Sequence, residues 1–194
     1  QSKIGLAHMP GSPMSQGWLK PRVLAASTHI LKTGSIEKLV GLEFLCMRTA
    51  KKCGVKVPEV TLLDFGKPVL AVERFDRVVT IDEEGLRVER IHQEDFAQAF
   101  GMTPASKYVE LPNGSIASIA QWIRSYAAKP TEDLSQFAKA VCFNYLIGNC
   151  DAHLKNISIM YQVGKRGPIR RLSPAYDLVS TSFFDRFSKE LAMA

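Results

Sequence analysis

The residues of this chain that are best suited to chemistry lie in a short polar loop between two apolar runs. The loop is part of the stretch LIGNCDAHLKNISIM, residues 146–160, and it places Asp151, His153 and Asn156 within six positions. Asp177 follows at the end of a predicted hairpin. Carboxylate and amide oxygens suit Mg²⁺, which keeps waters and substrate phosphates as its other ligands. Asn156 and Asp177 could therefore hold a metal ion while Asp151 orients an attacking hydroxyl, as phosphoryl transfer requires.

The same side chains also have ordinary structural uses. Asp151 could cap a turn, Asn156 could occupy a left-handed loop position, and Asp177 could begin another turn. His153 could brace the loop through hydrogen bonds. Cys150 and His153 are zinc-ligand types, but no second pair stands nearby in the sequence. The combination favours the metal-binding interpretation, because D-x-x-x-x-N followed by a hairpin and an Asp is the order in kinase catalytic and metal-binding loops.

Phosphoryl transfer also needs a cation against the phosphates of the nucleotide. Lys32 ends the run THILK in the first, strand-rich part of the chain and is well placed to provide that cation. Glu43 lies on the next predicted helix and could pair with Lys32. The alternatives are an exposed lysine at a strand end for Lys32 and a solvated helix residue for Glu43.

The first 91 residues are predicted to be mostly sheet with one helix. Residues 15–34 contain short apolar stretches broken by Pro and Gly, which are typical of strands. An amphipathic helix is predicted over residues 36–53, with Gly54 as its stop. Two hairpins are predicted next, around the turns DFGKP and DEEG.

The rest of the chain begins as helices. Apolar spacing predicts helices in HQEDFAQAFG, in SIASIAQWIRSYAA with Ser115 as its cap, and in TEDLSQFAKAVCFNYLIGN. A last hairpin is predicted from NISIMYQV and PIRRLSPAYDL, around the turn GKRG. A sheet-rich part with one helix, followed by a helical part with a loop and a hairpin, is the order of a bilobal nucleotide-handling enzyme. A boundary near residue 76 would place the run AVERFD between the lobes, where ligands tend to bind.

Composition bounds the class of protein. The chain has 194 residues, and its apolar content of 46% is ample for a core. Its net charge of +6 is not gathered into a basic stripe with aromatic residues, so direct nucleic-acid binding is not favoured. No apolar run approaches the roughly 18 residues that cross a bilayer, and the first residues do not form a signal peptide. Without a CxxC pair, Cys46, Cys53, Cys142 and Cys150 suit a reduced state, and we expect a soluble, cytoplasmic protein without a membrane partner.

Several blocks, in this order, carry a resemblance to a known family: QSK, THILK, EFLCMRTAKKCGVKVPEV, AVERFDR, RIHQEDFAQAFGM, FNYLIGNCDAHLKN and LSPAYDLVST. They resemble the HipA family of serine/threonine kinases, which are toxins of bacterial toxin–antitoxin pairs, and they span nearly the whole chain. The resemblance implies an α+β fold, an atypical bilobal kinase with a sheet-rich N-lobe over residues 1–75 and a mainly helical C-lobe over residues 76–194. It also implies that the chain is truncated at both ends relative to the family, which usually has a small N-terminal subdomain and a longer C-terminal helical region. The missing parts could have been removed, or a separate chain could supply them.

The resemblance further implies the roles of individual residues. Asp151 would be the catalytic base, with His153 beside it, and Asn156 and Asp177 would bind magnesium. Glu73 and Phe75 would contact adenine through backbone groups, although Phe75 could also be a core residue. The residues that the family pattern assigns to ATP are Lys3, Lys32, Glu73, Arg74, Phe75, His153, Lys155, Asn156, Tyr176 and Asp177. Gln1 and Ser2 would adjoin Lys3 at the end of a phosphate-binding loop, most of which is missing here.

Two functions follow from this resemblance. The first is an ATP- and magnesium-dependent serine/threonine protein kinase, a toxin that arrests growth by phosphorylating a protein substrate, with an aminoacyl-tRNA synthetase as the leading candidate. The second is a kinase-like binding module, weakly active or inactive, that engages a DNA-binding antitoxin. Retention of the charged site residues favours the first, and the incomplete phosphate-binding loop favours the second.

Overall fold

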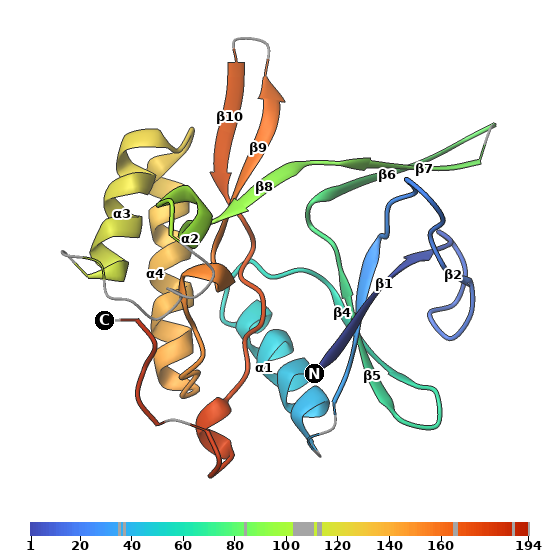
Figure 1. Cartoon of the computed structure of the whole chain (residues 1–194), viewed down its shortest axis with the longest axis horizontal. Helices are drawn as coiled ribbons and strands as arrows, with labels where there is room; N and C mark the ends of the chain where they lie inside the picture. Colours follow the sequence, from blue (N-terminus) through green and yellow to red (C-terminus); the bar gives the residue numbers. More distant parts are fainter. Residues whose placement is uncertain are drawn as a thin grey trace.

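The structure is a computed structural model, and it describes residues 1–34, 36, 38–83, 85–102, 111, 114–164, 167–187 and 189–193. Its fold is mixed α+β (Figure 1). A five-stranded antiparallel sheet lies on one side, and the helices of the second half of the chain lie on the other. Helix α1 (Leu39–Lys52) lies between them.

The five-stranded sheet positions the first group of candidate site residues. Its strands are paired in the order β2-β1-β3-β5-β4. In that register Lys3 of β1 lies opposite Lys32 of β3, so the sheet brings two ammonium groups to one place. Strand β1 was not predicted from the sequence, whereas the hairpin around DFGKP is confirmed as β4–β5. The strands are β1 (Ser2–His8), β2 (Trp18–Leu19), β3 (His29–Thr33), β4 (Val60–Asp64) and β5 (Pro68–Glu73).

Helix α1 confirms the helix predicted over residues 36–53, but it begins later. Lys38 has a φ of 68°, in the left-handed region, so the helical turn starts only at Leu39. Its buried side chains recur at the three- and four-residue spacing of one helix face, and Glu43 is among them. The last turn carries Lys51 and Lys52, where cations complement the helix dipole.

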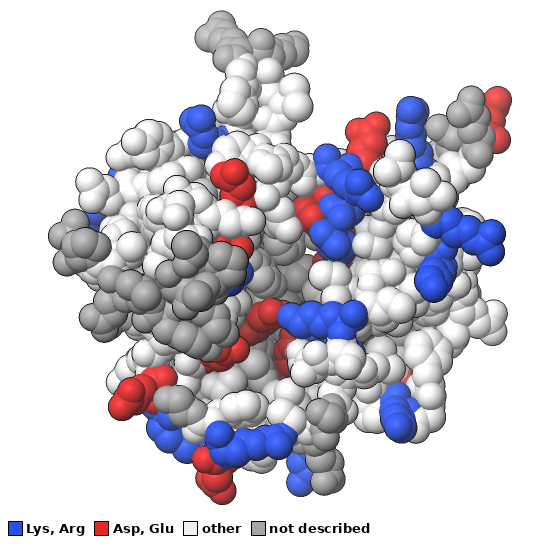
Figure 2. Space-filling model, viewed as in Figure 1, with Lys and Arg blue, Asp and Glu red and all other residues white. Residues whose placement is uncertain are grey.

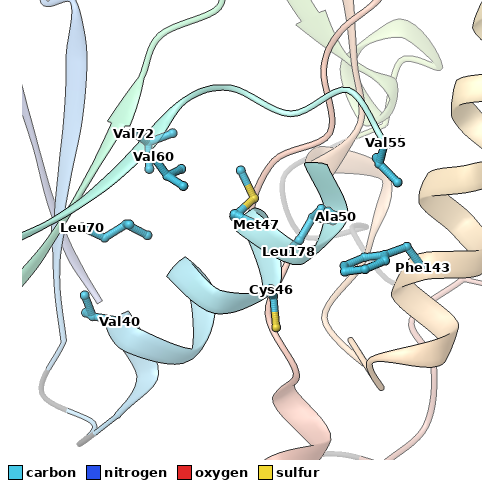
Figure 3. Close-up of a cluster of buried hydrophobic side chains, with 10 residues drawn as sticks. All are labelled: Val40, Cys46, Met47, Ala50, Val55, Val60, Leu70, Val72, Phe143 and Leu178. Carbon is cyan, nitrogen blue, oxygen red and sulfur yellow. The ribbon is translucent and has the colours of Figure 1, made fainter. Parts of the chain in front are cut away.

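One apolar cluster joins the two halves of the chain (Figure 3). Met47 and Ala50 of α1 pack with the inner residues of β4 and β5, and Phe143 reaches the same cluster from the last turn of α4 (Pro130–Leu146). Leu178, which is 2% exposed, joins from the loop that carries Asp177. The core therefore continues across residue 76, and it fixes α1, α4 and the Asp177 loop relative to one another.

After β5, the described residues form two further antiparallel sheets and the α-helices α2, α3 and α4. The predicted hairpin around DEEG is confirmed as β6–β7, and the last predicted hairpin is confirmed as β9–β10, although Lys165 and Arg166 of its GKRG turn lie outside the described residues. Both hairpins project from the body of the molecule (Figure 1). These elements are β6 (Arg77–Asp82), β7 (Gly85–Arg90), β8 (His92–Asp95), α2 (Phe96–Ala99), α3 (Ser115–Tyr126), α4, β9 (Ser158–Gly164) and β10 (Gly167–Leu172).

Two local predictions were wrong. The run HQEDFAQAFG was expected to be helical throughout, but its first four residues form β8, which pairs with β9. The helix starts only after Asp95, whose carboxylate accepts the backbone N–H of Gln98 in a capping box. Ser115 was expected to cap α3, but it is the first residue of that helix, and the cap is Gly114 without a side-chain hydrogen bond.

The part of the chain that the structure describes contains no helix that is long and apolar enough to cross a membrane. Cys46, Cys53, Cys142 and Cys150 are all free thiols, as their spacing predicted. On the face shown in Figure 2, basic and acidic side chains are interspersed, and some of both signs meet at the wall of a central hollow.

Candidate active site

Lys32 lies at the centre of a buried ion-pair network. Its side chain projects from β3, and the residue is 3% exposed. The ammonium group donates to the carboxylates of Glu43 on α1 and of Asp177. The predicted pairing with Glu43 is therefore present. The alternatives of an exposed strand-end lysine and a solvated helix residue are excluded by geometry, because Glu43 is only 2% exposed.

The charges in this network stabilise one another. Burial lowers the pKa of Lys32, but the carboxylates of Asp177 and Glu43 outweigh it, so the pKa lies above its usual value. Burial raises the pKa of Asp177, but the ammonium groups of Lys32 and Lys3 outweigh it, so the pKa lies below its usual value. Lys3 reaches the second oxygen of Asp177 at 3.1 Å. Lys32 and Asp177 therefore both stay charged at neutral pH.

Asp177 owes its position to an unusual backbone conformation. Its φ is 55°, in the left-handed region that Asp tolerates better than most residues. Such a position was the structural alternative for Asn156, but Asn156 instead ends a 3₁₀ turn, Leu154–Asn156. Buried Leu178 follows Asp177 and anchors that side of the turn in the apolar cluster.

The loop that carries Asp151 turns back on itself through Asn156. The amide Nδ2 of Asn156 donates to the backbone carbonyl of Asp151 at 2.9 Å, so its amide oxygen is the group left to accept or to ligate. The side chain of Asp151 is 56% exposed, whereas that of His153 is 9% exposed. His153 Nε2 lies 3.8 Å from Asp151 Oδ1, which is longer than a hydrogen bond but close enough for electrostatic attraction when the imidazole is protonated.

The start of this loop is fixed by residues that sequence reasoning did not single out. Thr181 accepts the backbone N–H of Cys150 at 2.7 Å through its hydroxyl. Gly148 has a φ of 64°, and a Cβ atom there would meet Ser182. These contacts come from a segment about thirty residues later in the chain. The Gly in LIGN was their only local signal, because it suggests a helix stop with positive φ.

Some of the predicted residues line a cavity of about 240 Å³, and Lys32 reaches its wall through its ion pairs with Glu43 and Asp177. It brings Asp151, His153 and Asn156 together with Asp177, and Lys3 and Glu43 complete its polar wall. A carboxylate with an amide oxygen fits magnesium, which commonly takes one or two carboxylates and completes its shell with waters and phosphates. Within the described ranges no group of three or more His, Cys, Asp and Glu side chains is arranged to hold a metal ion.

The other predicted nucleotide contacts form a second group outside that cavity. The rings of Phe75 and Tyr176 stack with their centroids 5.5 Å apart, so Phe75 contacts a candidate site residue. The hydroxyl of Tyr176 donates to the carbonyl of Lys155 at 2.8 Å. Burial raises the pKa of Tyr176, so the phenol stays protonated. The carbonyl of Lys155 thereby links the stack to the Asp151 loop.

The segment between β5 and β6 is held by a buried carboxylate. Asp76, which is 4% exposed, receives two hydrogen bonds from the guanidinium of Arg74, at 3.0 and 2.7 Å, and an ion pair from Arg77. Burial raises the pKa of Asp76, but the two guanidinium groups outweigh it, so the pKa lies below its usual value. The backbone N–H groups of Glu73 and Arg74 donate to the carbonyls of Glu59 and Thr28. Side-chain and backbone hydrogen bonds therefore hold the predicted adenine-binding segment in place.

Comparison with known proteins identifies the family of this chain. The sequence profile of the HipA-like C-terminal domain matches residues 1–194. The serine/threonine-protein kinase toxin HipA of Shewanella oneidensis is 36% identical over 184 residues, covering 87% of this chain and 40% of that protein. A Sinorhizobium fredii protein named "Putative kinase Y4mE" is 39% identical over 172 residues, covering 87% of this chain and 39% of that protein. The chain thus spans about two fifths of the curated relatives that it matches.

Solved structures place the fold in the same group. HipA of Shewanella oneidensis, solved in complex with HipB and its operator DNA, superposes with a TM-score of 0.83 at 31% identity, over 99% of this chain and 45% of that one. The Helicobacter pylori proinflammatory kinase CtkA shares the fold alone, with a TM-score of 0.55 at 16% identity over 81% of this chain. The resemblance found in the sequence blocks is confirmed, and this chain belongs to the family of HipA-like C-terminal domains.

Proposed function

We propose that this chain is the catalytic part of an ATP- and magnesium-dependent serine/threonine protein kinase. The observation that carries the proposal is the buried Lys32, which joins Glu43 and Asp177 at a cavity that also contains Asp151 and Asn156. Kinases use a strand lysine paired with a helix glutamate to bind the phosphates. They also use an exposed carboxylate as the base, and an amide with a second carboxylate as metal ligands. The kinase names of the relatives support the same activity.

In this proposal each charged group has a separate task. Lys32 and Lys3 neutralise the phosphates of ATP, and Glu43 holds Lys32 in place. Asn156 and Asp177 would hold magnesium, which would supply positive charge to offset that of the phosphates. Lys32 and Lys3 lower the pKa of Asp177, so its carboxylate is ionised and can bind the metal in place of a lysine.

Asp151 accepts the proton of the attacking serine. Its side chain is exposed into the cavity region, so a substrate hydroxyl can approach it. The serine oxygen forms a bond to the γ-phosphorus, the bond from that phosphorus to the β-phosphate oxygen breaks, and ADP leaves while the carboxylate takes the proton. His153, buried beside Asp151, favours one position of that carboxylate.

The base of the nucleotide would lie at the stacked pair of Phe75 and Tyr176. Glu73 and Arg74 directly precede Phe75 in the chain, and Arg74 is hydrogen-bonded to Asp76. The hydroxyl of Tyr176 donates to the carbonyl of Lys155 and so connects the stacked pair to the catalytic loop. We place the division between the sheet-rich lobe, residues 1–75, and the mainly helical lobe, residues 76–194, at this segment. Both lobes would then contribute to one ATP site.

We further propose that the kinase is a toxin with a protein partner that binds DNA. The solved Shewanella oneidensis HipA is described as part of a toxin–antitoxin system with HipB and operator DNA, which supports an antitoxin of this kind. An aminoacyl-tRNA synthetase is the proposed substrate, with growth arrest as the result. We also propose that the kinase acts in the cytoplasm.

The test is transfer of labelled γ-phosphate from ATP to serine. Purified aminoacyl-tRNA synthetases are incubated with the chain, magnesium and ATP, with the Asp151→Asn variant as the matched control. Phosphoserine that depends on magnesium and on Asp151 supports the proposal. Equal labelling by the variant would contradict the assigned base.

A kinase-like binding module is the second candidate, and one observation favours it. Both carboxylate oxygens of Asp177 are engaged by lysines, Lys32 on one side and Lys3 on the other, so a metal has to displace a cation to bind. If this arrangement is permanent, the chain binds its antitoxin without transferring phosphate. Binding to the cognate antitoxin that Asp177→Ala does not weaken, together with no response to magnesium and ATP, would favour this candidate.

A further inference from the structure

We propose that Asn149 is a positioning residue that sets the distance between the base and the metal ligands, an inference that rests on the proposed kinase function. Asn149 is 1% exposed and lies two residues before Asp151. Its amide Oδ1 accepts the backbone N–H of Asp151 at 3.3 Å. Its Nδ2 donates to the backbone carbonyl of Asp177 at 3.3 Å and to Oδ1 of Asn144 at 2.8 Å. One carboxamide therefore joins the backbones of Asp151 and Asp177.

The anchor of this carboxamide is helix α4. Asn144 lies in the last turn of α4, and its backbone carbonyl also accepts the N–H of Asn149 at 2.9 Å. Asn149 is thus held to the helix through both its backbone and its side chain. Phe143, the neighbour of Asn144, packs in the apolar cluster that contains Leu178, so the same helix turn supports the loop on the far side of Asp177.

The chemistry of this position requires an amide. Asn presents an acceptor and two donors on one short side chain, and all three contacts use them. Aspartate would accept from Asp151 but could not donate to Asp177, and alanine would do neither. Because the group is fully buried, a lost partner is not replaced readily by water.

The hydrogen bond from Asn149 Nδ2 helps to fix the orientation of the Asp177 carbonyl. Asp177 is in a left-handed conformation, outside regular secondary structure, so its orientation depends on local contacts. Residues that orient metal ligands typically change metal affinity by about 10- to 100-fold when they are removed. Asn149 orients both the proposed metal ligand Asp177 and the base Asp151, whereas the hydroxyl of Thr181 forms its hydrogen bonds with Gly148 and Cys150.

The experiment measures ATP binding by isothermal titration calorimetry at increasing magnesium concentrations. It compares the wild-type chain with Asn149→Ala and Asn149→Asp, and the unfolding temperature of each variant is recorded. Ile123→Ala, on α3 and 1% exposed, is the control for destabilisation without a contact to the site. Thr181→Val is the control for a lost hydrogen bond in the same loop.

We expect both Asn149 variants to need on the order of 10-fold more magnesium for half-maximal ATP binding. Ile123→Ala should lower the unfolding temperature and leave that concentration within about 2-fold of wild type. Thr181→Val should also stay within about 2-fold. The magnesium requirement is the informative quantity, because a purely structural role for Asn149 would change only the folded fraction.

The outcomes separate the inference from the proposal beneath it. If wild type binds ATP in a magnesium-dependent way and the Asn149 variants, while folded, need the same magnesium as wild type, the positioning role is wrong and the kinase proposal stands. If Ile123→Ala shifts the magnesium requirement as much as Asn149→Ala, the effect is general destabilisation and the inference is again wrong. If wild type shows no magnesium-dependent ATP binding, the proposed function fails and the positioning role falls with it.

Discussion

Replacing Lys32 by methionine removes the cation that lies between two carboxylates while keeping nearly the same volume. The side chains of Lys32 and Glu43 are 4% and 2% exposed, so the loss would leave Glu43 buried opposite no cation. Asp177 is 27% exposed and keeps Lys3, and Glu43 keeps one hydrogen bond from Gln1, so both are partly compensated. Removing one partner of a buried ion pair costs about 3–5 kcal/mol, and this partial compensation places the expected loss near the lower end, about 3 kcal/mol.

The assay is urea unfolding followed by circular dichroism at pH 7. In thermal unfolding of a chain of this length, the same loss of about 3 kcal/mol would lower the unfolding temperature by roughly 6–12 °C. Lys51→Met is the matched control, because Lys51 pairs with Glu59 on the surface, where the two side chains are 51% and 56% exposed. An exposed pair contributes about 0–1 kcal/mol, so this control should stay close to wild type.

A double variant tests the cause. Lys32→Met combined with Glu43→Met removes both buried charges and should be more stable than Lys32→Met alone, because apolar groups of similar volume replace the pair. The reasoning would be refuted if Lys32→Met lost no more stability than Lys51→Met. It would also be refuted if the double variant were no more stable than the single one.

Three further predictions concern the loops around the site. Gly148→Ala should destabilise the chain by about 1–3 kcal/mol in urea unfolding, because its φ is 64° and a Cβ atom would lie 2.8 Å from Cβ of Ser182. The control is Gly66→Ala, where φ is 74° and a Cβ atom would meet open space, and it should lose only about 1 kcal/mol. The stability that Asp177 contributes should be fully present above its unfolded pKa of about 4 and lost as pH falls through its lowered pKa, so the stability difference between wild type and Asp177→Asn should be largest near neutral pH and shrink as the pH falls below about 4; a constant difference would contradict that pKa shift. Asp151→Asn should lower phosphoryl transfer by about 10²- to 10⁴-fold and leave magnesium-dependent ATP affinity within about 3-fold, as measured by calorimetry, whereas an equal loss of affinity would show that Asp151 acts in binding.

Local sequence signals predicted the elements whose turns carry their own chemistry. The hairpins around DFGKP and DEEG were found because Gly and Asp mark tight turns between alternating strands. Helix α4 was found because its apolar spacing is long and regular. The pairing of Lys32 with Glu43 was also within reach, because a strand and the next helix bring the two residues together only eleven positions apart.

Contacts between residues far apart in the sequence could not be predicted. The residues His92–Asp95 are polar and read as the start of a helix, but hydrogen bonds to β9, more than sixty residues later, make them a strand. Likewise, the sequence suggested Asp177 as a ligand without indicating its left-handed backbone or its contact with Lys32, 145 residues earlier. The carboxamide of Asn149 could not be interpreted at all before Asp177 was placed beside it.

The most direct test of the central claim is the shift in unfolding temperature when ATP and magnesium are added together to this chain and to Asp177→Ala. A ligand that binds only the folded state stabilises it according to its occupancy, by about 2.7 kcal/mol at a concentration 100 times its Kd. The account predicts a rise for wild type that needs both magnesium and ATP and that is lost in Asp177→Ala. A rise of equal size in the variant, or no rise for wild type at millimolar ATP, would contradict the assignment of the cavity at Lys32 and Asp177 as a magnesium–ATP site.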